Sequence, residues 1–95
     1  MDKYVIKTNQ SKGDGKPCYF FAYCGKLCQT PIGCYELDSA KKFTHLGEAC
    51  VNLHHIEHQK EKAFGLDFHI VSVYRTGNTW KEREIVDLDS DIYRL

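Results

Sequence analysis

This sequence has few prolines, no long apolar run and no excess of one charge. The longest apolar run is the seven residues from Cys18 to Cys24, whereas a helix needs about 20 apolar residues to cross a bilayer. Thirteen acidic residues balance thirteen basic ones, so the attraction that drives non-specific binding to nucleic acid or anionic membranes is missing. The N-terminus is charged from Asp2 onward and has no apolar signal core. We therefore expect a cytoplasmic protein without a membrane segment.

The composition predicts one small folded domain. Of the 95 residues, 42% are hydrophobic and 27% are charged, which is too apolar for a disordered chain. A chain of this length buries only about 60–65% of the surface that its unfolded form exposes, so there is room for one core. We expect residues 1–95 to form a single domain that ends in an acidic tail, 88–95.

Aromatic and β-branched segments separated by glycine-containing turns predict a sheet. The segment 9–17 contains two glycines and a proline, so it is expected to close a hairpin between the first two strands. Strands are predicted at 2–8, 18–24, 66–75 and 80–87, with a short one near 34–36.

A second hairpin is predicted around residues 77–78, which are Gly-Asn. A two-residue loop at this point places Ile70 opposite Ile85. The same register places Arg75 opposite Trp80, where the two side chains can stack as a cation on an aromatic ring.

One amphipathic helix is predicted over 45–62, because its apolar residues recur with the helical period of 3.6. Thr44 is the expected N-cap, and Gly65 is expected to end the helix. The apolar stripe consists of Leu46, Ala49, Cys50, Leu53 and Ile56.

The order of the elements indicates the fold class. A single helical turn over 38–41 is expected before the main helix, with Ala40 and Phe43 on one face. Strands on both sides of one helix predict an α+β domain, with a small antiparallel or mixed sheet of four to five strands. The helix packs on one face of that sheet, where its stripe is buried.

The second strand points to a binding surface. Simple alternation places Cys18, Phe20, Ala22 and Cys24 on one face and three aromatic rings on the other. Because one helix covers only one face, an aromatic surface would remain open, and such surfaces are typical of protein interfaces. The predicted partner-binding residues are Tyr19, Phe21, Tyr23 and Trp80, with Asp87, Asp89 and Asp91 as a charged rim.

Two other uses of this aromatic face stay open. The segment 25–37 could fold over it, so that its rings belong to the core. A homodimer could also form through the same face.

The five cysteines, an odd number, do not require a disulfide framework in a protein without a secretion signal. Cys50 belongs to the helix stripe, and Cys18 and Cys24 are expected to face the core, as free cysteines commonly do. We therefore expect inert thiols and no cofactor.

A structural zinc ion is the alternative for the cysteines and histidines. Its predicted ligands are Cys24, Cys28, His54 and His58, although their spacing is not that of a zinc finger. Residues 54–58 also match the H-x-x-E-H pattern of inverted zinc proteases, but the chain offers no clear further ligand or cleft.

Enzymatic and nucleic-acid-binding functions have little support in the sequence. The chain contains no phosphate-binding glycine loop, G-x-S-x-G elbow or C-x-x-C pair, so we expect a protein that is not an enzyme. Lysines at 41, 42, 60 and 62 are offset by neighbouring acidic residues. A small single-stranded nucleic-acid-binding domain, using the aromatic strand as a stacking platform, is kept as an alternative.

The layout resembles a group of known proteins. An opening strand at 4–7, an aromatic strand running into Gly25, the segment 40–43 before a helix and a closing strand at 68–74 are similar to small α+β accessory proteins encoded by bacteriophages. This resemblance implies a protein that acts by binding, in the host-cell cytoplasm, as anti-CRISPR inhibitors do. We therefore expect a non-catalytic inhibitor or modulator of a host protein.

Overall fold

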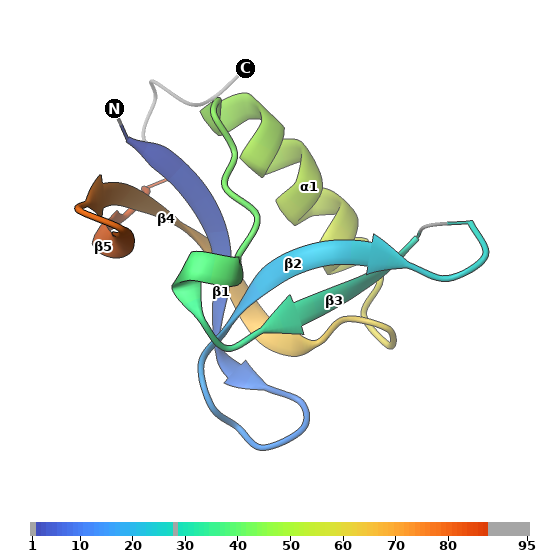
Figure 1. Cartoon of the computed structure of the whole chain (residues 1–95). Coiled ribbons are helices and arrows are strands. Elements are labelled where there is room, and N and C mark those ends of the chain that lie inside the picture. Colours follow the sequence, from blue (N-terminus) through green and yellow to red (C-terminus); the bar gives the residue numbers. More distant parts are fainter. Residues whose placement is uncertain (1, 28, 88–95) are drawn as a thin grey trace.

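A computed structural model describes residues 2–27 and 29–87. Five strands form one antiparallel sheet in the order β3-β2-β1-β4-β5, and one helix crosses it (Figure 1). The predicted α+β class is therefore confirmed. The elements are β1 (Lys3–Ser11), β2 (Cys18–Cys24), β3 (Thr30–Cys34), a 3₁₀ turn η1 (Leu37–Ser39), α1 (Leu46–His58), β4 (Gly65–Thr76) and β5 (Thr79–Ile85).

Strand β1 lies at the centre of the sheet. It pairs with β4 along its whole length, from Lys3 opposite Val73 to Ser11 opposite Gly65, and its second half pairs with β2. Near its start, the backbone N–H and C=O groups of Tyr4 bond to those of Phe43. Both sides of β1 are thus occupied, and the predicted hairpin between β1 and β2 is confirmed.

The helix covers one face of the sheet. Ala49, Leu53 and Ile56 are buried against Ile6 and Ile70, as the predicted stripe requires. The helix begins one residue later than predicted, at Leu46, and ends at His58 rather than at Lys62.

The chain leaves the helix through a turn rather than through a glycine cap. The N–H groups of Lys62 and Ala63 both donate to the carbonyl oxygen of Gln59, at 2.8 and 2.7 Å. The prediction that Gly65 ends the helix is wrong, because Gly65 is the first residue of β4 and lies against β1.

The other face of the sheet has a second, smaller core. Val5, Val71 and Val73 are buried there together with Tyr19 and Ala40. Ala40 follows η1, whereas Phe43 belongs to the core under the helix. The prediction that Ala40 and Phe43 share one face is therefore wrong, since the chain crosses from one core to the other between them.

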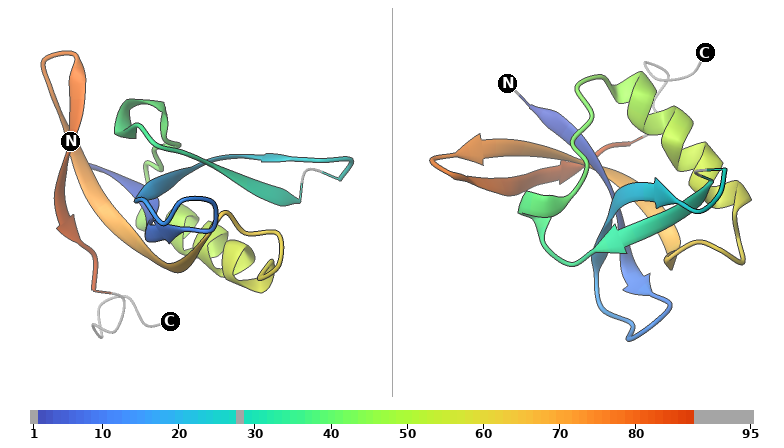
Figure 2. Two further views of the ribbon diagram at one scale, coloured as in Figure 1. Left: turned by 90° about the horizontal axis from the view of Figure 1, so that it is seen from below. Right: turned by 45° about the vertical axis from the view of Figure 1, so that its right-hand side comes forward.

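The hairpin of β4 and β5 has the predicted tip, with Gly77 at a positive φ of 62°. Arg75 lies opposite Trp80, as predicted, but Ile85 pairs with Val71 and not with Ile70. A bulge beside Ser72 and Val73 causes this one-residue shift. The two hairpins, β2–β3 and β4–β5, extend in different directions from the centre of the sheet (Figure 2).

Gly65 is required by close packing between β4 and β1. A Cβ atom there would lie 2.5 Å from Cγ2 of Thr8 and 2.9 Å from the carbonyl oxygen of Gln10. Thr8 is itself fully buried, so it has little room to move.

Alanine at position 65 should therefore destabilise the fold. We expect Gly65→Ala to lower the free energy of unfolding by about 1–3 kcal/mol through overpacking. Gly47→Ala is the matched control, because Gly47 lies in α1 with no atom within 4 Å of its would-be Cβ. That change should raise stability by up to about 1 kcal/mol, since alanine favours helix. Urea unfolding of both variants measures the difference, and equal stabilities would contradict the packing role of Gly65.

Candidate protein-binding surface

A bulge in β2 separates the three aromatic residues that were predicted to share one face. Phe20 pairs with Gly33 and Ala22 pairs with Ile32, which leaves Phe21 as the extra residue. Because the bulge breaks the alternation of side chains, the prediction that these three aromatic rings share one face is wrong. Tyr19 packs in the second core, whereas Tyr23 packs with Phe20 on the helix side.

Tyr23 connects β2 to the helix. Its hydroxyl donates to Oδ1 of Asn52 at 2.6 Å, and its ring meets the rings of Phe20 and His55 at 4.8 and 5.2 Å between centroids. Burial raises the pKa of the Tyr23 hydroxyl. This ring is therefore held within the fold.

Tyr19 belongs to a polar network above the second core. Its hydroxyl donates to Oε2 of Glu82 at 2.6 Å, and Nζ of Lys7 donates to the same carboxylate at 2.9 and 3.0 Å. Tyr19 is only 8% exposed, and burial together with the bond to Glu82 raises its pKa. The network joins β2, β1 and β5, which are not all neighbours in the sheet.

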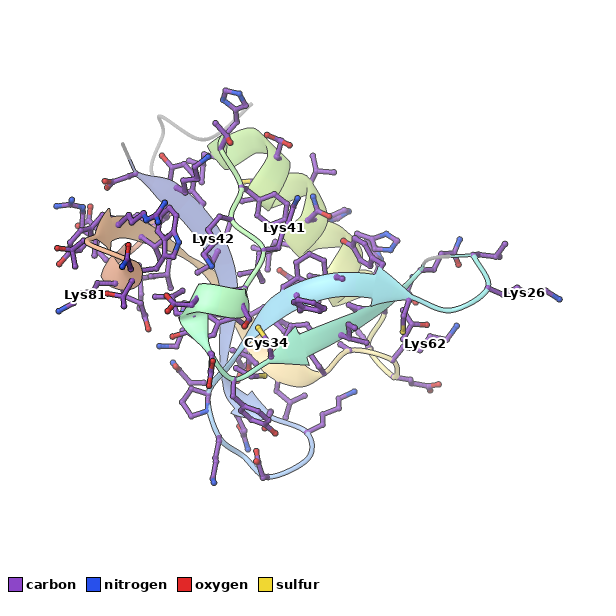
Figure 3. The ribbon with its side chains drawn as sticks, in the orientation of Figure 1. Lys26, Cys34, Lys41, Lys42, Lys62 and Lys81 are labelled. Atoms are coloured by element: carbon purple, nitrogen blue, oxygen red, sulfur yellow. The ribbon has the colours of Figure 1, made fainter. Side chains whose placement is uncertain are left out.

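Trp80 closes the second core against η1. Its backbone N–H donates to Oδ1 of Asp38 at 2.9 Å, and Nζ of Lys42 lies 5.4 Å from the centre of its ring. Lys42 also donates to the carbonyl oxygens of Leu37 and Asp38, beside η1 (Figure 3).

The prediction that Arg75 stacks on the Trp80 ring is therefore wrong. Lys42 occupies that position, while Nε of Arg75 donates to the carbonyl oxygen of Gly77 at 3.2 Å. The segment 25–37 was one possible cover for the second face of the sheet. Residues 37–42, which begin at the end of that segment, cover part of this face.

Only one residue of the predicted acidic rim, Asp87, lies in the described part of the chain. Asp87 is exposed near the end of the described chain, whereas Asp89 and Asp91 lie outside the described residues. The rim stays a prediction.

Three exposed large apolar residues lie along or just after the β2–β3 hairpin, and of these only Phe21 was predicted from the sequence. Val51, Leu66 and Ile85 are exposed on other elements. Phe21 is 45% exposed at the bulge, Leu27 is 75% exposed in the turn, and Tyr35 is 60% exposed just after β3. Figure 3 shows Lys26 extending from the far tip of this hairpin. Sequence periodicity could not separate Phe21 from its neighbours, because the bulge is a property of the pairing with β3.

Tyr35 is oriented by a hydrogen bond to the β1–β2 loop. Its hydroxyl donates to Oδ2 of Asp14 at 3.0 Å. Hydrogen bonds from Ser11, from the Lys16 N–H and from Tyr35 lower the pKa of Asp14 to about 2. The ring of Tyr35 is thus exposed but anchored.

The two edges of the sheet differ in charge. The outer strand β5 carries the alternating run Lys81-Glu82-Arg83-Glu84, a pattern that discourages association through an edge. The outer strand β3 has the uncharged sequence Thr-Pro-Ile-Gly-Cys. Pro31 has no N–H to donate, which makes this edge less suited to pairing with a further strand.

The proposed zinc ligands are not all in the described part of the chain. Cys24 is exposed at the end of β2, and Cys28 lies outside the described residues. His54 and His58 are exposed on the helix, with their Nε2 atoms 2.9 Å apart. Residues 2–27 and 29–87 contain no group of three or more side chains placed to hold a metal ion. The four-ligand zinc site stays a prediction.

The described thiols are held in different surroundings. Cys18 is buried and Cys50 is half-buried against the core, and burial raises the pKa of both thiols. Cys24, which was expected to face the core, is exposed instead. Cys18, Cys24, Cys34 and Cys50 are not in disulfide bonds.

The network around Glu82 predicts an acid-sensitive contribution to stability. Burial opposes ionisation of Glu82, but the hydrogen bonds from Tyr19 and Lys7 outweigh it and hold its pKa below the ordinary value of 4.5. A carboxylate with a lowered pKa stabilises the fold above its unfolded-state pKa, and this contribution is lost as the pH falls through the folded-state pKa.

Replacing this carboxylate should reduce the acid sensitivity. We expect Glu82→Gln to cost about 1 kcal/mol at pH 7, since the group is partly exposed, and to lose less stability than the unmodified chain as the pH falls below 4.5. Glu84→Gln, on the same strand, is the control with the same charge change. Urea unfolding at pH 7 and pH 3.5 measures the two losses. An identical pH dependence in both variants would contradict the role of Glu82.

Comparisons with protein-family models, with curated proteins and with solved structures each found no match. Within the described residues, no helix is long and apolar enough to cross a membrane. A function for the chain therefore has to be inferred from its own residues.

Proposed function

We propose that this chain is a non-catalytic protein-binding domain that contacts its partner through the β2–β3 hairpin. The observation that carries the proposal is the exposure of large apolar side chains along one projecting hairpin whose two strands carry no charged residue: Phe21, Leu27 and Tyr35. Aromatic side chains that are exposed but held in place lose little conformational entropy on binding, and they often dominate the energy of protein interfaces.

The partner that this proposal favours is a host protein. The chain has no net charge, so long-range attraction to a polyanion has no support, and a protein partner fits the apolar hairpin better. The layout that resembles phage accessory proteins extends the proposal to an inhibitor or modulator of host function. That extension depends on the resemblance alone.

The aromatic residues inside the fold have a different role in this proposal. Tyr19 and Tyr23 anchor β2 to the two cores, so we expect their replacement by alanine to unfold the domain. Phe21 is the exposed member of the predicted aromatic set, and it links that set to the proposed surface.

Binding should be lost by changes on the hairpin that leave the fold intact. The tagged chain is first used to isolate a partner from bacterial lysate, and that partner is then purified. We expect Phe21→Ser and Tyr35→Ser each to weaken the dissociation constant by on the order of tenfold or more, as for interface residues whose truncation costs over 1 kcal/mol. Calorimetric titration measures the constants, and thermal unfolding checks that both variants fold.

A serine at Val51 is the matched control for this experiment. Val51 is 70% exposed on the helix and is not part of the hairpin, so Val51→Ser should leave binding unchanged. Equal weakening by Val51→Ser, or unchanged binding in both hairpin variants, would refute the proposed surface. A dimer mass for the native chain and a monomer mass for Phe21→Ser would instead assign the hairpin to contact between two copies.

A further inference from the structure

Two exposed histidines on the helix converge on one point. His54 and His58 are four residues apart in α1, so they lie one turn apart on the same face. Their Nε2 atoms are 2.9 Å apart, and their rings are nearly perpendicular, at 85°. Both side chains are exposed to solvent, where a hydrogen bond between side chains contributes little to stability.

The separation of the two nitrogens fits the geometry of a chelated metal ion. Two imidazole nitrogens that bind one ion at about 2.0–2.1 Å are about 2.9 Å apart when the bonds meet at 90°, and about 3.4 Å apart at the tetrahedral angle. The observed 2.9 Å is the right-angle value. Right-angle coordination by nitrogen and oxygen ligands is typical of Cu²⁺ and Ni²⁺, whereas zinc prefers a tetrahedron.

The surroundings of the pair also favour a cation. His58 is in the last turn of a 13-residue helix, where the unpaired carbonyl groups create a partial negative charge. Among the described residues, no third histidine, cysteine or carboxylate joins the pair. The remaining coordination positions would therefore belong to water or to a ligand from another molecule.

We propose that His54 and His58 form an exposed two-histidine site for a late first-row divalent ion that prefers right-angle coordination, Cu²⁺ or Ni²⁺. The site needs neither Cys24 nor Cys28, which distinguishes it from the four-ligand zinc site predicted from the sequence. It lies on the helix rather than on the β2–β3 hairpin, so it stands independently of the proposed protein-binding function.

Titration with Ni²⁺ tests the site on the full chain after treatment with a chelator. Ni²⁺ is the probe because Cu²⁺ oxidises free thiols. We expect one ion to bind per chain, and we expect His54→Asn and His58→Asn each to weaken binding at least about tenfold, because the second ligand no longer acts at a high effective concentration. Calorimetry gives the affinity and the stoichiometry, and circular dichroism verifies that the variants remain helical.

Two controls separate this site from the alternatives. His45→Asn removes an exposed histidine at the start of the helix, which makes no capping hydrogen bond, and it should bind Ni²⁺ as the unmodified chain does. The double change Cys24→Ser, Cys28→Ser should also keep binding. Loss of binding in this double variant would overturn the two-histidine site in favour of the sites that use thiolates.

A measurement on the unmodified chain avoids any dependence on the variants. Proton NMR during a substoichiometric Ni²⁺ titration should broaden the ring resonances of two of the five histidines before the others. Uniform broadening of all five, or no binding of Ni²⁺ by the unmodified chain, would overturn the proposal.

Discussion

Burial of the central strand on both faces is the constraint on which the rest of the structure depends. Val5 and Ile6 are adjacent in β1, and both are fully buried. Because neighbouring residues in a strand point to opposite faces, the sheet needs a cover on each side. The helix provides one cover, and η1 with Trp80 provides much of the other.

This second cover explains why two of the four aromatic residues predicted to form an open surface, Tyr19 and Trp80, are packed within the fold. Tyr19 and Trp80 complete a core that the single helix cannot reach. The Tyr19 hydroxyl donates to Glu82, and the backbone N–H of Trp80 donates to Asp38. A buried tyrosine hydroxyl usually finds such a partner. Among the large apolar side chains that stay exposed, Phe21, Leu27 and Tyr35 lie along or just after the projecting β2–β3 hairpin.

One side of the helix is packed on the sheet, and the other side is exposed to solvent. Ala49, Leu53 and Ile56 hold it on the sheet, so the exposed positions one turn apart are fixed relative to each other. His54 and His58 occupy such positions. The same 3.6-residue period that buries the apolar stripe therefore brings two imidazole rings together in solvent.

Local patterns in the sequence determined the elements of this fold. The apolar period predicted the helix stripe, and the Gly-Asn pair predicted the tip of the second hairpin. These features depend on residues that are close in the chain, where steric and hydrophobic preferences act directly. The α+β class follows from their order.

Tertiary structure alone decided which side chains are exposed. The bulge at Phe21 depends on the pairing of β2 with β3, and it places Tyr19 and Tyr23 in different cores. Gly65 resembles a helix cap in the sequence, yet its role comes from contact with Thr8, 57 positions earlier in the chain. Bulges and close approaches of this kind are set by packing between distant segments, which a local period cannot encode.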